Sequence, residues 1–121
     1  KRNFMHHIKY IAPRRQAIYT NYYVTPDERK LLIKETSVSG LLTFEYYLYM
    51  ARQTNHAGKI TDSRTADWFG WTVSTARRHR LALIKNGWFH VEPHRSTNRH
   101  KVDIYYLGKD QVAQSRWVVK P

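Results

Sequence analysis

The chain has 121 residues, of which 41% are hydrophobic and 14% aromatic, and it contains no cysteine. This length allows one domain with a core, and the composition is too apolar for a disordered tail. The lack of cysteine excludes disulfides, thiolate metal sites and cysteine catalysis, and is typical of an intracellular, cytoplasmic protein. No stretch reaches the roughly 20 apolar residues of a membrane span. The net charge of +12 indicates an anionic partner, with nucleic acid first and an anionic membrane surface second.

Residues 1–24 combine basic and aromatic side chains without a helical period. Alternation over residues 17–24 is typical of a strand. We consider two interpretations: a packed edge strand with solvated basic residues, or an arm that lies along DNA phosphates. The basic residues of that arm would be Lys1, Arg2, Lys9, Arg14 and Arg15.

Residues 25–53 predict two scaffold helices. Thr25 can cap the first one, with Pro26 in the first helical position and Glu28 completing a capping box. This helix should run to about Thr36, followed by a break over residues 37–40. Residues 41–53 are apolar nearly all round, which predicts a central buried helix. Its surplus aromatic surface is the candidate contact for a homodimer.

Residues 60–86 predict a pair of helices joined by a turn at Gly70. A brief strand over Lys59–Thr61 should lead into the first helix, which Thr61 and Asp62 can cap. Thr72 can cap the second helix. At helical spacing the second helix has an inward stripe of Ala76, Leu83 and His79, and an outward face of Ser74, Arg77, Arg78 and Leu81, with Arg80 flanking it.

Residues 88–107 predict an antiparallel hairpin. A strand over residues 88–92 precedes a turn over residues 93–98, and residues 100–107 alternate as a second strand. Residues 108–121 predict a tail that either docks on the domain or begins a following one. Because the chain opens at Lys1 rather than methionine, we expect a single domain over residues 1–121 taken from a longer protein.

The charge is concentrated at both ends of a neutral middle. Residues 59–101 hold nine lysines and arginines against three acids, and residues 1–30 hold seven against two. These segments therefore carry +6 and +5 of the total. A surface charged only for solubility would spread its charge more evenly.

These residues resemble the winged helix-turn-helix superfamily over about residues 41–107. The matching motif is Thr61, Ala66, Gly70, Thr72, Thr75, Ala76, Arg78, Leu83, Gly87, Trp88 and Phe89. One departure is Arg80, at a position that is usually apolar in the superfamily. Either Arg80 extends toward phosphate, or the helix is rotated so that Leu81 takes part in the packing.

The resemblance implies an α+β, mainly α fold: a winged helix-turn-helix with a C-terminal β-hairpin wing. It also implies sequence-specific binding of double-stranded DNA. Within the superfamily, the layout is similar to the N-terminal domains of plasmid, phage or satellite-element replication initiators. The origin-binding domain of an initiator is thus the first functional interpretation, and a transcriptional regulator is the alternative.

Two surfaces would then contact DNA. On the recognition helix the candidates are Thr72, Ser74, Thr75, Arg77, Arg78, Arg80 and Leu81. On the wing they are His94, Arg95, Asn98, Arg99 and Lys101. The helix should read base edges in the major groove, while the wing should contact the backbone or minor groove.

Other classes of function are less well supported. The histidines show no recognised ligand spacing, so we expect no metal and no other cofactor. The nine acids form no cluster for Mg²⁺, so we expect no enzyme within this stretch. The DNA-binding domain of a nuclease and an RNA-binding module remain as further alternatives.

Overall fold

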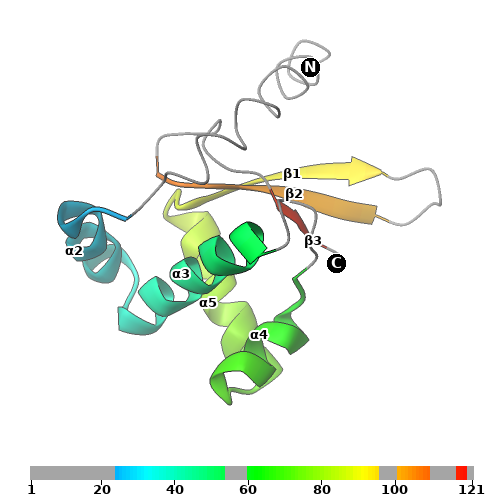
Figure 1. Cartoon of the computed structure of the whole chain (residues 1–121), viewed down its shortest axis with the longest axis horizontal. Helices are drawn as coiled ribbons and strands as arrows, with labels where there is room; N and C mark the ends of the chain where they lie inside the picture. Colours follow the sequence, from blue (N-terminus) through cyan, green and yellow to red (C-terminus); the bar gives the residue numbers. More distant parts are fainter. Residues whose placement is uncertain (1–23, 54–59, 96–100, 110–116, 120–121) are drawn as a thin grey trace, which may run out of the picture.

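The computed structural model of the protein describes residues 24–53, 60–95, 101–109 and 117–119. In this part of the chain four helices precede a three-stranded sheet. The helices gather on one side of the sheet, and a short turn joins the last of them, α5 (Val73–Lys85), to the first strand (Figure 1). The predicted class, α+β and mainly α, is confirmed. The predicted arm of residues 1–24 lies outside the described residues, apart from Val24.

Helix α2 (Pro26–Glu35) begins as predicted. The Thr25 hydroxyl accepts from the Glu28 amide at 3.1 Å, and the Glu28 carboxylate accepts from the Thr25 amide at 2.9 Å. This reciprocal capping box satisfies two amides that would otherwise have no partner in the first turn. The helix ends at a C-cap on Thr36, also as predicted.

Helix α3 (Val38–Gln53) begins earlier than the sequence predicted. A break between the two helices is present but is shorter than the expected residues 37–40, since α2 ends at Glu35 and α3 begins at Val38. The Ser37 hydroxyl starts the new helix by accepting from the Gly40 amide at 2.9 Å. Gly40 lies inside α3, where a glycine is required for steric reasons. A Cβ at this position would lie 2.3 Å from the Thr36 hydroxyl oxygen, so only glycine fits.

The core joins α3 to the sheet through aromatic side chains. Phe44 of α3 packs against Trp88 with ring centroids 5.7 Å apart, and against Phe89 at 5.8 Å. Tyr47 packs against Phe89 at 4.6 Å and Tyr105 at 5.9 Å. Each buried aromatic side chain removes a large apolar area from water, so these contacts contribute much of the core. The prediction that α3 is a buried central helix is confirmed.

The sheet consists of β1 (Phe89–Arg95), β2 (Lys101–Leu107) and β3 (Trp117–Val119), all antiparallel and in that order. The predicted hairpin is confirmed, but its predicted turn begins too early. Strand β1 continues through Pro93, which pairs with Asp103. Proline fits here because β1 is at the edge of the described sheet, where a missing amide hydrogen costs no ladder bond on the outer side.

Two smaller predictions have different outcomes. The brief strand predicted before α4 (Asp62–Phe69) is wrong at Ile60 and Thr61, since Thr61 is the extended N-cap of that helix. Lys59 lies outside the described residues. The predicted tail docks on the domain, because residues 117–119 pair with β2. Its strand character was not predicted, since so short a segment shows no clear alternation.

A polar cluster ties the end of α2 to the root of the hairpin. The Glu35 carboxylate accepts from the Trp88 indole at 2.9 Å and from the Lys109 ammonium at 2.5 Å. Lys109 also donates to the Asn86 carbonyl at 3.0 Å, and its ammonium lies 5.1 Å from the centre of the Trp88 ring. The Lys109 hydrogen bond is the main cause that lowers the pKa of Glu35. Helix α2 and the hairpin are therefore held together by a charged pair.

Replacing Leu83 with alanine should lower the free energy of unfolding by about 2–5 kcal/mol, because this side chain is fully buried in the core. Urea denaturation followed by circular dichroism measures the loss. Leu81→Ala is the matched control on the same helix, since Leu81 is 49% exposed. The control should change stability by about 0.5 kcal/mol or less. Equal losses in the two variants would contradict the assignment of the faces of α5.

Candidate nucleic-acid interface

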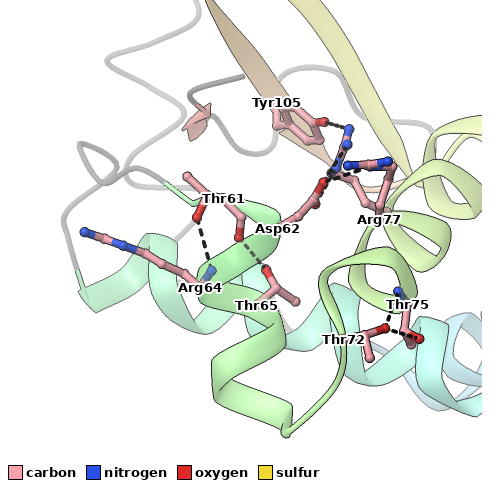
Figure 2. Close-up of polar contacts among 9 residues, drawn as sticks. Thr61, Asp62, Arg64, Thr65, Thr72, Thr75, Arg77 and Tyr105 are labelled. Carbon is pink, nitrogen blue, oxygen red and sulfur yellow. Dashed lines mark hydrogen bonds and ion pairs between the residues drawn. The ribbon is translucent and has the colours of Figure 1, made fainter.

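Helix α4 (Asp62–Phe69) begins at Thr61, whose hydroxyl accepts from the Arg64 amide at 3.1 Å (Figure 2). The Thr65 hydroxyl donates to the Thr61 carbonyl, also at 3.1 Å. Thr61 alone is the cap, so the prediction that Asp62 shares this role is wrong. Asp62 is the first helical residue, and its carboxylate has other partners.

Gly70 ends α4 in the left-handed conformation, with φ of 74°. A Cβ at Gly70 would have nothing within 4 Å, so the conformation, rather than space, requires glycine. After the turn the Trp71 amide donates to the Ala66 carbonyl at 2.9 Å. Ala66 of α4 and Ala76 of α5 are both buried, so each helix turns a small side chain toward the interior.

Helix α5 (Val73–Lys85) begins at Thr72. The Thr72 hydroxyl accepts from the Thr75 amide at 3.1 Å and donates to the Thr75 hydroxyl at 3.0 Å (Figure 2). The predicted cap is confirmed. Both threonines were also predicted to face DNA, and in this structure their hydroxyls are already joined to each other, which orders the first turn of the helix.

The two faces of α5 are those that the sequence predicted. Ala76 and Leu83 are buried, and His79 is half-buried with its ring 5.0 Å from that of Trp71. Burial is the main cause that lowers the pKa of His79, and the charge of Arg78 adds to it. The exposed residues of this helix are Val73, Ser74, Arg77, Arg78, Leu81 and Lys85.

Arg80 is held inside the protein. Its Nε and Nη2 donate to the two carboxylate oxygens of Asp62 at 2.8 and 2.9 Å, and its Nη1 donates to the Tyr105 hydroxyl at 3.0 Å. The side chains of Arg80 and Asp62 are only 21% and 15% exposed. The hydrogen bonds to Asp62 are the main cause that raises the pKa of Arg80. This bidentate pair ties α5 to α4 and to β2.

Both alternatives for Arg80 are therefore wrong. The guanidinium does not extend toward solvent, where phosphate would be reached, and α5 is not rotated to bury Leu81, which remains half exposed. Asp62 lies 18 residues before Arg80, and Tyr105 lies 25 residues after it. Sequence reasoning missed this cluster because it assigned Asp62 to a helix cap. The overlooked signal was a pair of opposite charges, Asp62 and Arg80, on the two helices of the predicted helix pair.

Arg77 lies beside the same carboxylate but is held far less firmly. Its Nε is 3.8 Å from an oxygen of Asp62, and its side chain is 58% exposed. An exposed ion pair of this length contributes less than about 1 kcal/mol. Arg77 is therefore free to exchange Asp62 for a stronger anionic partner, whereas Arg80 is not. The side chains of Asp62, Arg77 and Arg80 therefore have a combined net charge of +1.

The hairpin extends past the helices at the end where Arg95 pairs with Lys101 (Figure 1). His94 lies in β1 next to this end. The other predicted wing residues, Asn98 and Arg99, lie outside the described residues. The hairpin thus places the backbone of two basic positions at one end of the sheet, beyond the helix pair.

Comparisons with family models, with curated proteins and with solved structures find no match to this chain. Among the described residues, no group of three or more histidine and acidic side chains is placed to hold a metal ion. None of the helices in the described part of the chain is both long and apolar enough to cross a membrane.

Asp62→Asn should lower the free energy of unfolding by about 1–3 kcal/mol, because it leaves the mostly buried Arg80 guanidinium without its charged acceptor. Thermal or urea denaturation measures the loss. Asp67→Asn removes an exposed carboxylate from the same helix and should change stability by no more than about 0.5 kcal/mol. A matching loss in both variants would mean that the Arg80 pair is not what stabilises this junction.

Proposed function

We propose that this domain binds double-stranded DNA sequence-specifically as a winged helix-turn-helix, with α5 as the recognition helix and the β1–β2 hairpin as the wing. The observation that supports this most is that the arginines of α5 differ in their surroundings. Arg80 fixes the helix to α4 and to the hairpin, while Arg77 and Arg78 remain exposed on the outward face. A basic helix held rigidly next to a hairpin is the geometry that this class of DNA reader uses.

Each arginine on the outward face has a proposed role. Arg77 or Arg78 makes a bidentate contact with the O6 and N7 atoms of a guanine, the most common specific contact in the major groove. Ser74, one turn before Arg78, reaches an adjacent base or phosphate. Because Arg80 is committed to Asp62, it contributes to recognition through the position of α5 and not by direct contact.

Electrostatics supplies the affinity that does not depend on sequence. The chain carries a net charge of +12, and each phosphate that a basic side chain neutralises releases condensed counterions. The wing residues His94, Arg95, Asn98, Arg99 and Lys101 contact the backbone or minor groove in this proposal. The basic residues before residue 24 add phosphate contacts.

For the biological role we propose the origin-binding domain of a replication initiator, with a transcriptional regulator as the alternative. A homodimer through residues 41–53 has less surface available than the sequence predicted. Phe44, Tyr46 and Tyr47 are buried within this domain, and Tyr49 is the aromatic residue of α3 that stays exposed in the described structure. We therefore expect any pairing of copies to be set mainly by the spacing of DNA sites.

Selection of bound duplexes from a random DNA pool tests the proposal. We expect a motif to be enriched at moderate salt, since phosphate affinity alone enriches no sequence. Direct repeats of the motif would favour an initiator, and an inverted repeat would favour a dimeric regulator. Failure to enrich any motif, or stronger binding to RNA than to duplex DNA, would contradict the proposal.

Arg77→Ala should weaken binding to the selected duplex by about 1–3 kcal/mol if Arg77 reads a guanine, and should affect random duplex much less. Fluorescence anisotropy with both duplexes measures the two losses, and Arg78→Ala is tested in the same way. Lys30→Ala removes one exposed positive charge from α2 and is the charge-matched control. Equal losses on selected and random DNA for both arginine variants would contradict base reading by this face.

A further inference from the structure

Leu81 lies at the centre of the outward face of α5. It is 49% exposed, and it follows Arg77 and Arg78 by four and three residues, so the three side chains are neighbours on the helix surface. Side chains on a helix lean toward its N-terminus. The Leu81 side chain is therefore directed back over the turn that carries the two arginines.

Packing does not account for this position. The inward side of α5 is already formed by Ala76 and Leu83, both buried, and by the Arg80 pair with Asp62. A single exposed leucine on a protein surface needs no explanation by itself. What distinguishes Leu81 is that it is an apolar group between two exposed arginines, on the face that the proposed function turns toward the major groove.

The base edges in the major groove offer an apolar side chain one apolar group to contact. Guanine, cytosine and adenine present hydrogen-bond donors and acceptors there, whereas thymine also presents its 5-methyl group. A leucine that enters the groove between two arginines can remove its side chain from water favourably only against such a methyl group.

We propose that Leu81 is a specificity-determining residue that contacts the 5-methyl group of a thymine next to the base pair read by Arg77 or Arg78. This inference rests on the proposed function and adds one recognised base to the DNA site. The preferred site then contains a T·A pair adjacent to a G·C pair, and the chain distinguishes thymine from uracil at that position.

The test replaces thymines of the most enriched selected duplex by deoxyuridine, one position at a time. Uracil keeps the pairing and every hydrogen-bonding group and removes only the methyl group. We expect one position at which the wild-type protein binds the uracil duplex about fourfold more weakly. This is the loss of affinity that corresponds to burying one carbon group less. Leu81→Ala should bind both forms of that position equally.

Leu31→Ala is the matched control, because Leu31 is a leucine on α2 that is 40% exposed. This variant should keep the full wild-type discrimination between thymine and uracil. Since the uracil substitution changes only the DNA, the result for the wild-type protein does not depend on whether any variant folds.

The possible outcomes separate this inference from the proposed function. Enriched duplexes that bind equally with thymine or uracil at every position would overturn the inference and leave sequence-specific binding intact. Discrimination that persists undiminished in Leu81→Ala would also overturn it. If the selection enriches no motif, the proposed function fails, and the inference fails with it.

Discussion

The bidentate pair between Arg80 and Asp62, completed by the Tyr105 hydroxyl, is the interaction on which the arrangement of the helix pair depends. A guanidinium that is largely removed from water needs a charged acceptor and further hydrogen bonds, or its desolvation is not offset. Asp62 on α4 and Tyr105 on β2 meet that need only when α5 lies between them in one rotation. The same pair therefore stabilises the rotation of α5 that buries Ala76 and Leu83 and leaves Arg77 and Arg78 exposed.

The hairpin is held to the helices at a second point. Trp88 precedes β1 and Lys109 follows β2, and both donate to Glu35 at the end of α2. Between these polar ties lies the aromatic packing of α3 against Phe89 and Tyr105. Apolar contacts alone would allow the helices and the sheet to shift against each other. Polar groups whose hydrogen bonds can form in only one geometry select a single arrangement. Together with the hydrogen bond from Arg80 to Tyr105, these contacts fix the hairpin relative to α5, which the proposed function requires.

The arginines of α5 show how one residue type takes different roles according to its surroundings. Arg80 and Arg77 share the carboxylate of Asp62, but the first is mostly buried at 2.8 Å and the second is mostly exposed at 3.8 Å. Screening by water weakens the second pair and leaves Arg77 available to an outside anion. Asp62 thus fixes one arginine and lies close to the other without neutralising both. This supports the proposed use of the outward face for DNA.

The sequence by itself determined the starts of α2, α4 and α5, the turn at Gly70 and the two faces of α5. Caps such as Thr25, Thr61 and Thr72 act on an amide three residues away, so their geometry is local and readable from spacing. Only the tertiary structure decided the role of Arg80 and the third strand. Each depends on a partner brought close by folding, which is the Asp62 carboxylate for Arg80 and the second edge of β2 for residues 117–119. Such proximity leaves no periodic pattern in the chain, because it arises from packing between elements and not from the repeat of a helix or strand.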